Sequence, residues 1–217
     1  MLTLMVPDAK LQVSVREHEG PDALIYFGGN AEDVSLRLAT FSAAFPGRAV
    51  YLLHYRGYGG SSGAPSEEAL QRDALALFDR VHALHKNVAV IGCSLGTGVA
   101  IRLASQRPAS QLVLVMPYNS LEELAASRFP YLPVSVLLLD KFESWRYAGR
   151  ITAPTLILAA ENDEVIPRAS TEALLARFAK GIATFALIPG AGHNNLSERP
   201  EYVKLLMDGL RRVEFGH

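Results

Sequence analysis

The sequence predicts an α/β protein built on a mostly parallel, eight-stranded sheet. Short apolar segments alternate with longer segments whose apolar residues recur at helical spacing, as in strands joined by crossover helices. Most of the short segments are almost continuously apolar, which is typical of parallel strands covered on both faces. The expected strands span residues 2–6, 11–15, 23–27, 49–53, 88–91, 112–116, 155–159 and 184–188.

The first elements are expected to be a hairpin and a helix. Residues 11–15 alternate apolar and polar side chains like a half-buried strand, and they can pair with residues 2–6 across Pro7 and Asp8. After the third strand, residues 33–45 place four apolar side chains on one helical face. The sequence therefore predicts an antiparallel edge followed by the first covering helix.

The next helix is expected to begin after Ser66, whose hydroxyl can cap it, and Glu67 and Glu68 in its first turn suit the helix dipole. Its buried stripe would comprise Leu70, Ala74, Leu77, Phe78 and Val81.

The longest connection, residues 117–150, is expected to hold one helix at 121–127 and another helical piece ending near 142. This connection is too short for a separate lid domain. A last helix is predicted over residues 197–213.

Length and composition indicate a globular chain with one domain over residues 1–217. Hydrophobic residues make up 49% of the 217 and charged residues 20%, and the net charge is −1. No cluster of basic residues favours nucleic acid, and no apolar segment approaches the roughly 20 residues of a membrane helix. A single cysteine, Cys93, excludes an internal disulfide and a clustered structural zinc site. We expect a cytoplasmic protein without metal or organic cofactor.

The most informative motif is Gly92-Cys93-Ser94-Leu95-Gly96, which joins an apolar strand to a helix of small residues. A serine on so sharp a turn needs neighbours without bulk, and its hydroxyl projects clear of the sheet. The following helix directs unpaired N–H groups towards the same point. The motif predicts Ser94 as a nucleophile.

A nucleophilic serine requires a histidine base and a carboxylate that orients it, in the chain order Ser, Asp, His. Asp163 follows the seventh expected strand and His193 follows the eighth, so all three residues would meet at one sheet edge. Glu161 and Glu164 flank Asp163, and spacing alone leaves the acid open, with Glu164 as the second choice. His193 is the expected base.

Two backbone amides are expected to bind the oxyanion. The glycines of Gly28-Gly29-Asn30 let the backbone turn close to a substrate, and the amides of Asn30 and Leu95 would be the donors. The Asn30 side chain could also cap the next helix.

Other candidates carry weaker signals. The glycine-rich residues 55–63 lack the lysine and the glycine spacing of nucleotide-binding loops, so a turn beside the pocket is expected there. Cys93 is more simply a small buried residue than a redox group. Aromatic residues that could contact substrate are Tyr58, Tyr118, Phe129, Tyr131, Trp145 and Tyr147. For the last four, core or interface packing is an alternative of at least equal weight.

With these residues, the chain resembles the α/β-hydrolase superfamily over almost its whole length, and it is most similar to small, nearly lidless serine hydrolases that include protein depalmitoylases. The matching segments are Phe27-Gly-Gly-Asn-Ala-Glu, Tyr55-Arg-Gly-Tyr-Gly-Gly-Ser-Ser-Gly, Gly92-Cys-Ser-Leu-Gly-Thr-Gly, Glu161-Asn-Asp-Glu-Val-Ile-Pro and Gly192-His. The resemblance implies that Ser94 is the nucleophile, Asp163 the acid and His193 the base, and that Asn30 and Leu95 bind the oxyanion. The chain has Gly28 where the family usually has histidine.

These observations predict a serine hydrolase that cleaves ester or thioester bonds of a small or acyl substrate through an acyl-enzyme. Alternatives are a serine peptidase or amidase with the same three residues, and a ligand-binding protein that retains the fold without catalysis. The apolar residues 134–139 raise a further hypothesis, an acylhydrolase acting at a membrane surface. The oligomeric state is not predicted.

Overall fold

The expected sheet is confirmed by a computed structural model, which describes residues 1–211. Its eight strands lie in the order β1-β2-β4-β3-β5-β6-β7-β8. β1 pairs antiparallel with β2 and β2 antiparallel with β4, while β3 to β8 are parallel. The strands are β1 Leu2–Val6, β2 Ala9–Arg16, β3 Asp22–Phe27, β4 Ala49–Leu53, β5 Asn87–Cys93, β6 Gln111–Val115, β7 Thr155–Ala160 and β8 Ala183–Ile188.

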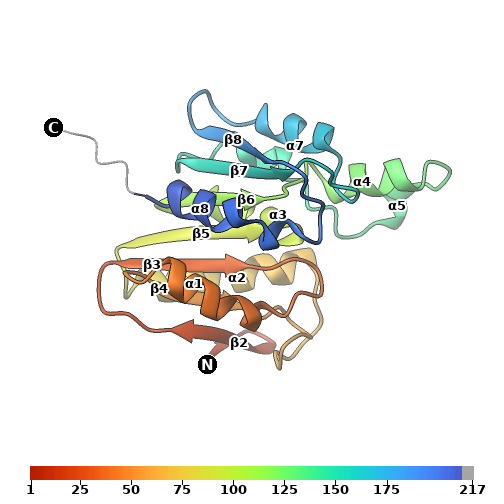
Figure 1. The fold of residues 1–217 in the computed structure, drawn as a ribbon. Helices are drawn as coiled ribbons and strands as arrows, with labels where there is room; N and C mark the ends of the chain where they lie inside the picture. Colours follow the sequence, from red (N-terminus) through yellow and green to blue (C-terminus); the bar gives the residue numbers. More distant parts are fainter. Residues whose placement is uncertain (212–217) are drawn as a thin grey trace.

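Helices cover both faces of this sheet. In Figure 1, α1 and α8 lie in front of the strands and α2 and α3 behind them. The α-helices are α1 Leu38–Ala44, α2 Glu67–His82, α3 Leu95–Ala104, α4 Leu121–Arg128, α5 Val134–Leu137, α6 Trp145–Ala148, α7 Arg168–Leu175 and α8 Pro200–Gly209. Two 3₁₀ turns, η1 Val34–Arg37 and η2 Leu196–Glu198, precede α1 and α8.

Two predicted helices begin differently from expectation. The predicted helix at 33–45 opens as η1, and Asp33 rather than Asn30 caps it by accepting from the Ser35 amide. The predicted helix at 197–213 is interrupted at Arg199, whose backbone is extended, because Pro200 has the fixed φ of a first helical residue. Residues 212 and 213 of that prediction lie outside the described residues.

The connection between β6 and β7 contains less helix than predicted. The helix expected at 121–127 is confirmed as α4, but the second helical piece is the four-residue α5 and does not reach residue 142. Two further helices, α6 and α7, were not predicted from the sequence; α7 follows β7. Within residues 1–211 there is no separate lid domain; α4 and α5 extend from the right of the sheet in Figure 1.

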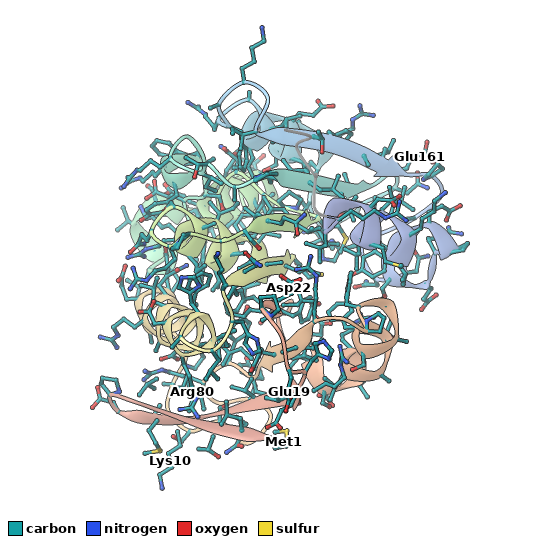
Figure 2. All side chains as sticks on the ribbon, turned by 90° about the vertical axis from the view of Figure 1, so that its left-hand side faces the viewer. Met1, Lys10, Glu19, Asp22, Arg80 and Glu161 are labelled. Atoms are coloured by element: carbon teal, nitrogen blue, oxygen red, sulfur yellow. The ribbon has the colours of Figure 1, made fainter. Side chains whose placement is uncertain are left out.

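The core lies between the sheet and its helices. Strands β3 to β6 are buried along almost their whole length, as expected for strands covered on both sides. The stripe predicted for α2 is buried, and Ser66 caps this helix by accepting from the Ala69 amide. Figure 2 labels Lys10 on the β1–β2 hairpin and Glu161 just after β7, near opposite ends of the sheet.

A buried ion pair holds the glycine-rich loop that follows β4. Arg56 donates through Nε and Nη2 to the two carboxylate oxygens of Asp73 on α2, at 2.7 and 2.8 Å. The two side chains are 5% and 1% exposed. The same guanidinium donates to the carbonyl of Pro7. The loop therefore serves as a fixed turn beside the sheet edge, as its sequence predicts.

Substitution Arg56→Met is expected to lower the free energy of unfolding by about 3–5 kcal/mol, because the Asp73 carboxylate would stay buried without its partner. Urea titration monitored by circular dichroism measures this change. The matched control is Arg107→Met, since the Arg107–Asp79 pair is largely exposed and is expected to contribute about 0–1 kcal/mol. Equal losses for the two variants would contradict the interpretation.

A buried histidine, His54, is expected to make the free energy of unfolding depend on pH. His54 is 6% exposed, and its Nε2 lies 2.9 Å from the Ser14 hydroxyl. Burial lowers the pKa of His54, partly opposed by the charge of Asp33. The neutral ring is therefore favoured in the native state, so the unfolded chain binds the proton more readily.

The stabilisation from neutral His54 is expected to be complete above the unfolded-state pKa of about 6.5 and to disappear as the pH falls through the lower folded-state value. The free energy of unfolding should consequently decrease more between pH 7.5 and pH 5 in the wild type than in His54→Gln. Urea titrations of both proteins at each pH measure the difference. Parallel pH profiles would show that His54 does not contribute.

Candidate active site

Ser94 occupies the sharp turn between β5 and α3. Its backbone has φ 49° and ψ −117°, in the left-handed region that a residue with a side chain rarely adopts. The turn brings the serine to the carboxyl edge of the parallel strands, directly before the N-terminus of α3. The structure therefore has the strained turn that the motif predicts.

The two glycines of the motif are required by close backbone contacts. A Cβ on Gly92 would lie 2.5 Å from the carbonyl oxygen of Gly96, and a Cβ on Gly96 would clash with the carbonyl oxygen of Phe27. Without side chains at these positions, the start of α3 packs directly against the end of β3. This packing brings the loop after β3 next to Ser94.

The three predicted residues lie in contact although they are distant in the sequence. The Ser94 hydroxyl is 3.1 Å from His193 Nε2, and His193 Nδ1 is 3.0 Å from both carboxylate oxygens of Asp163. The side chains of His193 and Asp163 are only 11% and 6% exposed. The arrangement has the geometry of a nucleophile, a base and an orienting acid.

The carboxylate of Asp163 is fixed by its own loop. Its Oδ1 accepts hydrogen bonds from the amides of Val165 and Ile166, at 2.9 and 2.8 Å. These two bonds hold Oδ1 in place, and both carboxylate oxygens face the imidazole. The side-chain orientation is therefore determined by the backbone that follows β7.

The two neighbouring glutamates bind the backbone of the histidine loop instead of its ring. Glu164 accepts from the amide of His193 at 3.3 Å, and Glu161 accepts from the amide of Gly190 at 2.8 Å. The sequence left the identity of the acid open between Asp163 and Glu164. In the structure it is Asp163 that contacts the imidazole.

The loop after β3 lies against the serine from the other side. A Cβ on Gly29 would be 3.6 Å from Ser94 Cβ, so the two backbones are in close contact. Asn30, Leu95 and Ser94 line the same cavity. Leu95 is the first residue of α3, so its amide lies outside the intrahelical hydrogen bonds.

A cavity of about 410 Å³ opens beside Ser94 and has mainly apolar walls. Tyr58 and Tyr118 line it as proposed from the sequence, and the Tyr118 hydroxyl donates to the carbonyl of Leu95 at 3.1 Å. Phe129 is not among the lining residues and is 54% exposed, because α4 ends at Arg128 and the chain turns outward. Lining residues that were not predicted from the sequence include Leu70, Leu121, Leu124, Leu138 and Phe142.

A second cavity of about 310 Å³ also borders Ser94 and is lined in part by Glu32, Arg37, His193 and Tyr202. Cys93 also borders it. Burial, with a smaller contribution from the charge of Glu32, raises the pKa of the Cys93 thiol to about 12. The thiol is therefore protonated near neutral pH, in keeping with a packing role.

The segment around α5 exposes apolar side chains near the mouth of the larger cavity. Leu137 and Leu139 are 62% and 90% exposed, while Leu138 between them lines the cavity. The hypothesis of a membrane-surface enzyme stays a prediction, which flotation with phosphatidylcholine vesicles tests directly. In the described part of the chain, no helix has both the length and the apolar character to cross a bilayer.

No group of three or more His, Cys, Asp or Glu side chains within residues 1–211 is placed to hold a metal ion. Of the other aromatic candidates, Tyr131 is 98% exposed. Tyr147 lies under the guanidinium groups of Arg102 and Arg150, and Trp145 under those of Arg146 and Arg177. None of these three rings lines the cavity beside Ser94.

Two family models match the chain. Residues 22–138 match one described as the alpha/beta hydrolase fold, and residues 137–200 match one described as serine aminopeptidase, S33. Together they include all three residues of the Ser94 cluster.

Individual proteins show the same relationship. An uncharacterized protein of Mycobacterium tuberculosis is 38% identical over 201 residues, covering 89% of this chain and 69% of that protein. The alpha/beta hydrolase domain-containing protein 17B of Homo sapiens is 30% identical over 190 residues, covering 84% and 64% respectively. Among solved structures, Est1E from Butyrivibrio proteoclasticus, determined with ferulic acid bound, superposes with a TM-score of 0.77 at 15% identity, covering 96% of this chain and 95% of that one.

Proposed function

Because the chain belongs to the α/β-hydrolase superfamily, we propose that it is a serine hydrolase that cleaves carboxylic ester or thioester bonds of acyl substrates. The observation that carries this proposal is the continuous chain of contacts from Ser94 Oγ through His193 to Asp163. A binding protein has no need of a nucleophile, a base and an acid held in contact at three strand ends.

In the proposed reaction Ser94 Oγ attacks the substrate carbonyl while His193 Nε2 accepts the hydroxyl proton. Asp163 holds the imidazole in the tautomer with the proton on Nδ1 and stabilises the imidazolium. The amides of Asn30 and Leu95 donate to the oxyanion, aided by the positive end of α3. His193 then protonates the departing alcohol or thiol, and water hydrolyses the acyl-enzyme by the same steps in reverse.

The apolar cavity supports an acyl group as the part of the substrate held beside Ser94. Its volume of about 410 Å³ lies within the usual range of small-molecule sites, and its walls are mainly aliphatic and aromatic. We assign the acyl chain to this cavity. Two expectations from the sequence, a single domain over residues 1–217 and a cytoplasmic location, stay predictions.

Substitution Leu124→Trp is expected to lower kcat/KM for p-nitrophenyl octanoate by at least about tenfold, because the indole would fill space between α4 and Ser94. The value for p-nitrophenyl acetate should change by less than about twofold. Steady-state hydrolysis measures both. Leu132→Trp is the matched control, since Leu132 is 54% exposed and does not line the cavity. Equal losses of kcat/KM on the two esters would contradict the assignment of the acyl chain to this cavity.

Amide hydrolysis is a second candidate, favoured by the match of residues 137–200 to the serine aminopeptidase model. The same nucleophile and base cleave amides when the leaving amine is protonated. A panel of p-nitrophenyl esters, acyl thioesters and aminoacyl p-nitroanilides separates the candidates. Turnover of the anilides at a rate comparable with the esters would favour the peptidase.

A further inference from the structure

We infer that Glu32 is a positioning residue that sets the orientation of the oxyanion loop, residues 28–30, beside Ser94. This inference rests on the proposed function, since it assigns the geometry of that same site. Glu32 does not touch the nucleophile, the base or the acid. It acts through the backbone of the loop that precedes it.

The Glu32 carboxylate lies at the centre of a hydrogen-bonded cluster. Its Oε2 accepts from the amide of Gly29 at 2.7 Å, and its Oε1 accepts from Arg37 Nε at 2.8 Å. The hydroxyl of Tyr26 lies 2.9 and 3.0 Å from the two oxygens. The Glu32 side chain is only 16% exposed. A carboxylate with this many donors has one preferred position.

The bond to Gly29 determines which amide remains free to bind substrate. Because the Gly29 amide is bound to Glu32, it is not free to bind substrate, whereas Asn30, the next residue, lines the cavity beside Ser94. The proposed function assigns the oxyanion bond to the amide of Asn30. The Glu32 amide also donates back to the Gly29 carbonyl at 3.4 Å, so residues 29–32 form a closed turn. Ala31 has φ 58° within this turn, a conformation that local bonds must maintain.

Arg37 has a second effect, on charge. A carboxylate beside Ser94 would disfavour the developing oxyanion, and the guanidinium that pairs with Glu32 offsets this charge. Glu32 and Arg37 both line the second cavity, which Ser94 also borders. The pair therefore supplies rigidity to the loop without placing net negative charge near the reacting carbonyl.

The test compares Glu32→Ala and Glu32→Gln with the wild type on p-nitrophenyl butyrate. Glu32→Ala is expected to lower kcat by about 10²-fold with little change in KM, the loss typical of removing one oxyanion donor. Glu32→Gln keeps an oxygen that can accept from the Gly29 amide, so it should recover at least tenfold of that loss. Asp33→Ala is the matched control, because Asp33 caps η1 in the same loop and makes no bond to Gly29.

A merely structural role would not alter the preference for oxygen over sulfur at the reacting carbonyl. Wild type should hydrolyse the butyrate ester much faster than its thionoester, since sulfur accepts hydrogen bonds weakly, and Glu32→Ala should reduce that ratio. An unchanged ratio, a loss confined to KM, or an equal loss in Asp33→Ala would overturn the inference. If wild type shows no turnover that depends on Ser94, the proposed function fails, an outcome distinct from failure of the Glu32 assignment alone.

Discussion

Substitution Ser94→Ala is expected to lower kcat for ester hydrolysis by at least about 10⁴-fold, because the hydroxyl that forms the acyl-enzyme is removed. Alanine retains the Cβ, so the backbone strain at φ 49° is unchanged and the fold should persist. Steady-state kinetics with p-nitrophenyl butyrate measures the loss. Circular dichroism and urea titration verify that the variant is folded.

The control for this prediction is Thr97→Val, one turn into the same helix. The Thr97 hydroxyl donates to the Ser94 carbonyl at 2.7 Å but does not contact His193. This variant should keep kcat within about tenfold of wild type, because it loses one neutral hydrogen bond at the helix start. If Ser94→Ala hydrolysed the ester as fast as the wild type, Ser94 would not be the nucleophile.

Substitution Asp163→Asn is expected to lower kcat by about 10⁴-fold. Asparagine keeps an oxygen for the amides of Val165 and Ile166, so the loop should retain its shape. Its amide group would then face His193 Nδ1 and favour the tautomer with the proton on Nε2, which cannot accept the Ser94 proton. The measurement is the steady-state kcat at pH 8.

Glu164→Gln is the matched control for the acid. Glu164 lies one residue away and, within residues 1–211, accepts from the His193 amide and not from the imidazole, so Glu164→Gln should keep most of the activity. A large loss in Glu164→Gln with little loss in Asp163→Asn would reverse the assignment of the acid. The pair of variants therefore resolves the ambiguity that the sequence left between two adjacent carboxylates.

The sheet was predictable because each strand is a short apolar run with turn residues at its ends. Placing Ser94, Asp163 and His193 at one edge followed from the topology alone, since parallel strands carry their following loops to the same side. Gly92 and Gly96, on either side of Ser94, predicted the sharp turn between β5 and α3. These features depend on local sequence and on connectivity.

What the sequence did not show depends on contacts between distant segments. Leu124 and Leu138 line the cavity from a connection whose irregular path after α4 has no periodic pattern. Phe129 was expected at the substrate, but it is exposed because α4 ends immediately before it. Glu32 carries no motif by itself, and its importance follows only from the four donor contacts that the fold brings to its carboxylate.

The proposed function requires Ser94 to be an activated nucleophile. Intact-mass spectrometry after treatment with a fluorophosphonate tests it without knowledge of the substrate. We expect one covalent adduct on the wild type, none on Ser94→Ala, and strongly slowed labelling of His193→Gln. A folded wild type that forms no adduct, or a Ser94→Ala variant labelled as fast as the wild type, would contradict it, and the absence of labelling would favour a ligand-binding protein that retains the fold.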